Sequence, residues 1–92
     1  MNYLKKIPII FLLLFFYTSI YSGIACTCEV PRLGGNERDR YQYAADGDDC
    51  CSSPANAELL AWHYVDHWSE GAWVQQSQVN IPPATAQSKC CP

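Results

Sequence analysis

The chain has 92 residues, six of which are cysteine, and a formal net charge of −3. Residues 26–92 hold four basic side chains against nine acidic ones, because two of the six basic residues are lysines near the start, so this part has a net charge of −5. Such acidity argues against nucleic-acid binding, where Lys and Arg must neutralise phosphates, and against a membrane-lytic peptide, which needs a basic face.

Residues 1–25 have the pattern of a signal peptide. Two adjacent lysines precede an apolar run of about fifteen residues, which is short for a membrane span of about twenty. Gly23 and Ala25 are small residues at the −3 and −1 positions, which predicts cleavage after Ala25 and a secreted, extracellular chain of residues 26–92. An uncleaved anchor and a lipoprotein acylated on Cys26 are the alternatives.

The predicted mature chain forms one small cysteine-rich domain. A domain of this length buries only about 60% of its unfolded surface, so disulfides are expected to help stabilise it. Its cysteines form three pairs along the sequence: Cys26 with Cys28, Cys50 with Cys51, and Cys90 with Cys91. Bridges within such pairs are strained, so we expect every pair to bond to the other two and to join both ends to the middle. Vicinal spacing suits tetrahedral zinc poorly, and no metal or other cofactor is expected.

Two short strands are predicted before the central cysteine pair. Residues 26–30 alternate between two faces, and residues 40–44 alternate aromatic with polar side chains. Residues 33–39 are charged and glycine-containing, which predicts a loop that joins the two strands as a hairpin. Residues 46–49 are acidic but lack the spacing of a calcium loop, so we interpret them as a solvated turn.

The longest periodic stretch, residues 54–70, is predicted to be an amphipathic helix. Its apolar residues recur at the spacing of one helix face: Ala57, Leu60, Ala61, Tyr64, Val65 and Trp68. Ser53 fits an N-cap, and Gly71 fits a left-handed C-terminal cap. Residues 72–81 favour a further strand, paired with 40–44. The expected fold class is α+β, with this helix packed on a small antiparallel sheet of two or three strands and stapled by disulfides.

Catalytic and metal-binding patterns are weak in this sequence. His63 and His67 would share a face of the predicted helix with Glu70, which is a zinc-chelating arrangement. Residues 63–67 are similar to the inverted zinc-protease pattern, with Asp66 in place of glutamate, but aspartate is short for that role. No serine lies in a nucleophile-elbow motif. We expect no enzyme, and a small secreted hydrolase or metal-binding protein is the third hypothesis for function.

The tryptophans outside the apolar stripe are the candidate binding residues. On the predicted helix Trp62 lies about 120° from Trp68, with Leu59 nearby, and Trp73 follows the helix end. A tryptophan exposed beside a leucine is typical of an interaction hot spot. Trp62, Leu59 and Trp73 are therefore the predicted contact residues. The alternative is that the strand and the tail wrap the helix and make Trp62 part of the core.

The cysteine frame follows the leader and consists of Cys26-Thr27-Cys28 and the Cys-Cys pairs at 50–51 and 90–91. This frame resembles that of the small secreted cysteine-rich proteins of filamentous fungi, many of which are candidate effectors. The resemblance implies an effector-like role at a host surface or in the extracellular space, and it transfers no functional residues.

The leading hypothesis is a monomeric, non-enzymatic protein that binds a host or extracellular protein or saccharide. We expect no nucleic-acid partner, and no membrane partner after leader cleavage. The second hypothesis is a secreted toxin, an antimicrobial peptide or a protease inhibitor that acts through the loop at 33–40.

Overall fold

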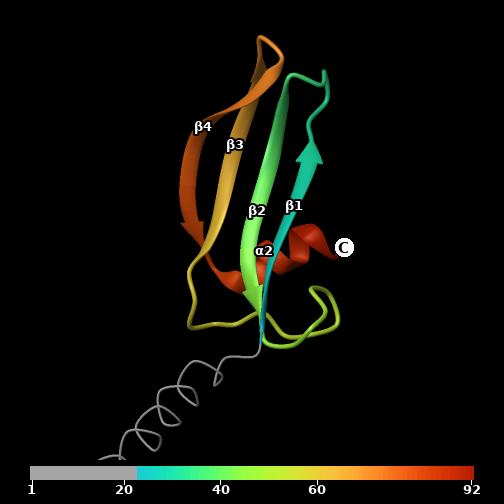
Figure 1. The fold of residues 1–92 in the computed structure, drawn as a ribbon, viewed down its shortest axis with the longest axis vertical. Coiled ribbons are helices and arrows are strands. Elements are labelled where there is room, and N and C mark those ends of the chain that lie inside the picture. The colour runs from blue at the N-terminus through green and yellow to red at the C-terminus, as the bar shows by residue number, and fades with distance from the viewer. Residues whose placement is uncertain (1–22) are drawn as a thin grey trace, which may run out of the picture.

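The computed structural model describes residues 23–92, so residues 1–22 of the predicted leader lie outside the described residues. Figure 1 shows one layer of four antiparallel strands, with a short helix lying across one end of the sheet. The elements in chain order are β1 (Ile24–Pro31), β2 (Glu37–Ala45), β3 (Ala61–Ser69), β4 (Ala72–Ile81) and the helix α2 (Pro83–Cys90). The sheet order is β1-β2-β3-β4, so each strand pairs with its neighbours in sequence.

The predicted helix over residues 54–70 is wrong. Residues 54–60 form turns and a single bridge, and residues 61–69 form β3. Both β2 and β4 supply hydrogen-bond partners to β3, and its aromatic and β-branched residues favour a strand. The sheet therefore has four strands rather than two or three. Residues 72–81 form a strand as predicted, but they pair with β3 and not with 40–44.

The apolar stripe of that predicted helix does not enter the core as a unit. Leu60 is 66% exposed and Trp68 is 44% exposed, whereas Ala61 and Tyr64 are buried. Successive side chains of a strand point to opposite faces, so Ala61 lies on one face of the sheet and Tyr64 on the other. Apolar residues spaced three and four apart therefore do not share one face in this segment, because it is a strand and not a helix.

The residues predicted to cap the helix belong to turns. Glu70 and Gly71 join β3 to β4 with φ of +52° and +83°, the signs required by a two-residue type I′ turn. Ser53 Oγ accepts a hydrogen bond from the backbone N–H of Asp49. The Asp49 carboxylate accepts from the next backbone N–H groups, chiefly that of Ser52, and this lowers its pKa. The acidic segment is thus a hydrogen-bonded turn.

The predicted hairpin near the start is confirmed and is longer than expected. β1 pairs with β2 along its full length, from Ile24 opposite Ala45 to Pro31 opposite Arg38. The predicted cleavage site after Ala25 falls inside this strand, because both residues before the cut are paired with β2. Among residues 23–92, no helix has the length and apolar character needed to span a membrane.

All six cysteines form disulfides, as predicted. The bonds join Cys26 to Cys50, Cys28 to Cys90 and Cys51 to Cys91, with sequence separations of 24, 62 and 40. Each cysteine pair is therefore bonded to both of the others, which is the arrangement that the spacing predicted. The bonds fasten β1 and the loop after β2 to α2, whose C-terminal end lies beside β1 in Figure 1.

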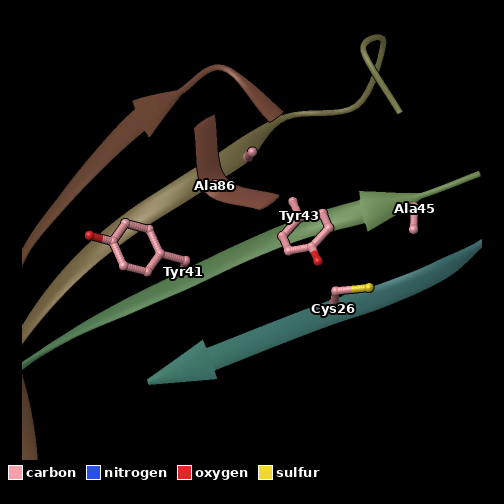
Figure 2. Packing of buried hydrophobic residues seen from close by; sticks show 6 residues of the cluster. Cys26, Tyr41, Tyr43, Ala45 and Ala86 are labelled. Atoms are coloured by element: carbon pink, nitrogen blue, oxygen red, sulfur yellow. The ribbon is translucent and has the colours of Figure 1, made fainter. Parts of the chain in front are cut away.

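The core is small and lies between α2 and one face of the sheet, as Figure 2 shows. Its buried members are Cys26, Tyr41, Tyr43, Ala45, Ala61 and Ala86. Ala86 is the buried residue of α2, and its small side chain lets the helix approach the sheet closely. The Tyr43 hydroxyl donates to the carbonyl oxygen of Cys50 at 2.7 Å, which satisfies its polar end. We call this side of the sheet the helix face and the opposite side the open face.

Candidate binding surface

The open face of the sheet carries most of the aromatic side chains of β3 and β4. Strand alternation and the cross-strand register place on it Trp62, Tyr64, Asp66 and Trp68 of β3, Arg38, Arg40 and Gln42 of β2, and Trp73, Gln75 and Gln78 of β4. The buried cluster around α2 is built from residues of the other face. The open face is thus the place where aromatic and amide side chains are available to a ligand.

A buried ion-pair network occupies the middle of the open face. Asp66 is 2% exposed, and its Oδ2 accepts hydrogen bonds from Nε of both Arg38 and Arg40 at 2.9 Å. The hydrogen bond from Arg40 is the main cause that lowers the pKa of Asp66. The Arg40 guanidinium lies over the Tyr64 ring, 4.0 Å from its centroid. The Arg38 guanidinium lies over the Trp73 ring, 4.4 Å from its centroid. The two arginines and Asp66 thus interact with one another and with the neighbouring rings, and these contacts link β2 to β3 and β4.

Trp73 and Trp68 lie at the end of the open face near the β3–β4 turn. Their rings meet edge to face, with centroids 5.2 Å apart and an interplanar angle of 69°. Trp68 is six residues along β3 from Trp62, a distance on the order of 20 Å. The three predicted contact residues therefore do not form one patch, because Trp73 lies far from Leu59 and Trp62.

Leu59 and Trp62 meet in a groove at the opposite end of the open face. The groove has a volume of about 480 Å³ and is lined by Ala25, Gln42, Tyr43, Ala44, Glu58, Leu59, Leu60 and Trp62. Leu59 is 44% exposed and Leu60 is 66% exposed, while Trp62 is partly exposed. Glu58 is the one charged residue of this lining. The result is an accessible, mainly apolar site with a few polar groups at its border.

The loop that carries the two leucines is held in place by hydrogen bonds. Asn56 Oδ1 accepts from the backbone N–H of Glu58 at 2.8 Å and from that of Leu59 at 3.2 Å. The N–H of Asn56 donates to the carbonyl oxygen of Ala44, at the end of β2. Leu59 and Leu60 are thus presented by an ordered turn that is anchored to the sheet, which lowers the entropy cost of binding.

Gln42 supplies a polar group beside Trp62. The two residues are cross-strand partners on β2 and β3. The hydroxyl of Tyr64 donates to Oε1 of Gln42 at 3.0 Å, which fixes the orientation of the amide. The amide nitrogen of Gln42 then remains a donor for a ligand in the groove.

His63 belongs to the helix face and interacts with the opposite strand. Its ring stacks on Tyr41 with centroids 4.7 Å apart, and its Nε2 donates to Oδ1 of Asp39 at 2.7 Å. Asp39 also accepts from Nε and Nη2 of Arg32, at 3.0 and 2.8 Å. The pKa of Asp39 falls to about 2, mainly because of the hydrogen bond from Arg32. This cluster is a cross-strand clamp between β2, β3 and the residue that follows β1.

The zinc-chelating arrangement that a helix would give His63 and His67 does not form. Four residues on a strand span about 13 Å, whereas on a helix they are adjacent. The Nδ1 atom of His67 is buried, with no hydrogen-bond partner among residues 23–92. Within the same range, no group of three or more potential metal ligands comes together.

The loop suggested for a protease inhibitor is shorter than predicted, because residues 37–40 belong to β2. Leu33 stands fully exposed in it. Backbone hydrogen bonds from Arg32 to Glu37 and from Gly35 to Arg32 hold the remaining turn.

Sequence reasoning found Leu59 and Trp62 but missed Leu60 and Gln42, together with the network around Asp66. One available signal was the alternation of Arg38, Arg40 and Gln42, which places three polar residues on one face of a strand. No family model, curated protein or solved structure matches this chain.

Proposed function

We propose that this chain is a secreted, non-enzymatic interaction protein that recognises an extracellular ligand through the groove at Leu59, Leu60 and Trp62. The observation that carries the proposal is the exposure of both leucines beside a partly exposed tryptophan, in a domain with little apolar core. Contiguous exposed apolar groups of this kind mark interaction sites. Disulfides at every cysteine suit an oxidising compartment such as the extracellular space.

The groove is a better candidate than the tryptophan pair near the β3–β4 turn. Trp73 is covered on one side by Arg38 and meets Trp68 at its edge. Those contacts give both rings a role in the sheet itself. Leu60 stands outside the buried cluster, on a loop whose turn is fixed by Asn56. Truncating Leu60 should therefore weaken binding with little effect on folding.

An apolar fluorescent dye, 8-anilinonaphthalene-1-sulfonate, provides a test that needs no knowledge of the natural ligand. Binding of the dye to the oxidised protein should fall at least about threefold in L60S and in W62A. L33S is the matched control, because it removes an exposed leucine at the other end of the sheet. It should leave dye binding unchanged.

Thermal unfolding of the same variants separates a binding residue from a core residue. L60S should change the free energy of unfolding by no more than about 0.5 kcal/mol, as is usual for surface positions. Y43A removes a buried aromatic ring and should cost about 3–5 kcal/mol. If W62A destabilised the domain as much as Y43A, or if dye binding were equal in all variants, the proposal would be wrong.

A further inference from the structure

The two edges of the sheet differ in what lies beside them. At β1, disulfides from Cys26 and Cys28 bring the loop after β2 and the end of α2 alongside the strand, as Figure 1 shows. At β4 no described element lies on the outer side, so its outward backbone N–H and C=O groups face solvent. A strand edge of this kind is a template for pairing with another strand.

The side chains of β4 lack the charge and the proline that protect many exposed edges. Natural edges are commonly blunted by charged residues, by proline, by short length or by β-bulges. β4 is ten residues long and contains neither a charged residue nor a proline. Val74 and Val79 are 51% and 53% exposed, one in each half of the strand. By contrast, β1 carries Glu29 and ends at Pro31.

A β-bulge limits the part of β4 that is regular. Val65 faces Ser77 and Asp66 faces Gln75, so Gln76 has no partner in β3. The bulge bends the strand and so protects the edge at this point. The five residues 77–81 beyond it are regularly paired with β3, and they form the length over which a second strand fits best.

We infer that β4 pairs in antiparallel fashion with β4 of a second copy of this chain, over residues 77–81. Residues 26–92 carry a net charge of −5, so two copies repel each other overall, whereas β4 holds no charged residue and its edge brings no like charges together. Antiparallel pairing of one segment with itself has the two-fold symmetry that most homodimers show. With Val79 at the symmetry axis, Ser77 faces Ile81 of the other copy, and both lie on the helix face. This inference replaces the expectation of a monomer.

Such a dimer would place two grooves on one continuous open face. Trp62 is the partner of Asn80 on β4, so the two tryptophans are three strand spacings apart. That distance is about 15 Å, which suits a repetitive or multivalent ligand. The inference stands on the edge strand and does not depend on the function of the groove.

Sedimentation velocity of the oxidised protein, from about 1 μM to about 1 mM, is the first measurement. We expect a reversible dimer with a dissociation constant on the order of 100 μM, since the interface is small. A monomer over the whole range would overturn the inference.

A charge-swap experiment identifies the strand. V79K and V79E each place like charges across the symmetry axis and should be monomeric at concentrations where the unmodified protein is dimeric. An equimolar mixture of the two should form a heterodimer, because Lys then faces Glu. T27K changes an exposed residue of β1 and is the matched control, which should dimerise normally. If V79K and V79E dimerised as well as T27K, or if their mixture stayed monomeric, pairing through β4 would be excluded.

Circular dichroism of V79K and V79E keeps the test interpretable. Both substitutions lie at a half-exposed edge position, so both variants should keep the spectrum of the unmodified protein. A dimer lost together with the spectrum would count against pairing through a folded β4.

Discussion

The two ends of the sheet are held together by different kinds of interaction. At the end covered by α2, three disulfides surround a buried cluster that includes Tyr43 and Ala86. From the middle of the sheet toward its hairpin end no disulfide occurs among the described residues. The cross-strand links there include ion pairs, with Asp66 between two arginines and Asp39 bound to Arg32. Disulfides restrict the unfolded chain, whereas a buried ion pair makes the folded chain sensitive to the loss of either partner, because the remaining charge is left unpaired. A domain with so small a core therefore has two separate sources of stability, which should fail under different conditions.

Reduction should have the largest effect, because it removes the covalent links at the α2 end. Taken singly, each bridge contributes on the order of 3–4 kcal/mol in the loop-entropy model, and a domain of this size has little else in reserve. At neutral pH, full reduction should unfold the protein, which far-ultraviolet circular dichroism would detect after alkylation of six thiols. A native spectrum with six alkylated cysteines would show that the hairpin end stabilises the fold by itself.

The substitution D66N should have the next largest effect, at the hairpin end. It leaves the two arginines around a neutral amide, and breaking a buried pair from one side costs about 3 kcal/mol or more. Urea unfolding of the oxidised protein measures the loss. Tryptophan fluorescence should change as well, since Arg38 lies over Trp73. E70Q in the exposed turn is the control, and an equal midpoint in D66N and E70Q would contradict this role for Asp66.

Acid should weaken the hairpin end by a smaller amount. The pKa of Asp39 is about 2 in the folded protein, below its ordinary value of 3.8, because Arg32 donates to it. The folded state thus binds this proton less readily, so its contribution is complete above about pH 4 and is lost as pH falls toward 2. Urea midpoints across this range should fall for the unmodified protein and fall less for D39N. Parallel pH curves for the two proteins would contradict the assignment.

The parts of the fold that could be predicted from the sequence are those with local signals. The hairpin of β1 and β2 follows from two alternating segments around a turn with Gly34 and Gly35, which both adopt positive φ. The strain of bridging adjacent cysteines predicts that every cysteine pair bonds to both of the others, and it leaves open which cysteine bonds to which. Both inferences use residues close in sequence, or a constraint that holds for any fold.

β3 could not be recognised because its alternation is concealed. The open-face series Trp62, Tyr64, Asp66 and Trp68 contains a buried carboxylate where a strand pattern calls for an apolar residue. Its arginine partners lie 26 and 28 residues earlier, so no local window shows that the charge is neutralised. The same segment also matches a helical spacing, so its local pattern favours a helix.

Two residues of the candidate site, Leu59 and Trp62, could be predicted, but the helix face on which that prediction rests does not exist. Leu59 and Trp62 are close because a turn at Asn56 leads directly into β3, and not because they share a helix face. Trp73 follows the predicted helix in sequence, which places it near Leu59 and Trp62 in that interpretation. The β3–β4 turn instead carries it to the far end of the sheet, opposite Trp68.

The disulfides also form a closed circuit. With two bridges in place, the two cysteines of the third are already linked by a path of seven residues, namely 26, 27, 28, 50, 51, 90 and 91. Once the other two bridges exist, the bond between Cys28 and Cys90 thus closes a loop of only seven residues. Without those bridges, the same bond would close a loop set by its sequence separation of 62. In the loop-entropy model that bond then contributes about 2 kcal/mol in place of about 4. The circuit is redundant: loss of one bridge leaves all three cysteine pairs connected, whereas loss of a second releases one of them entirely.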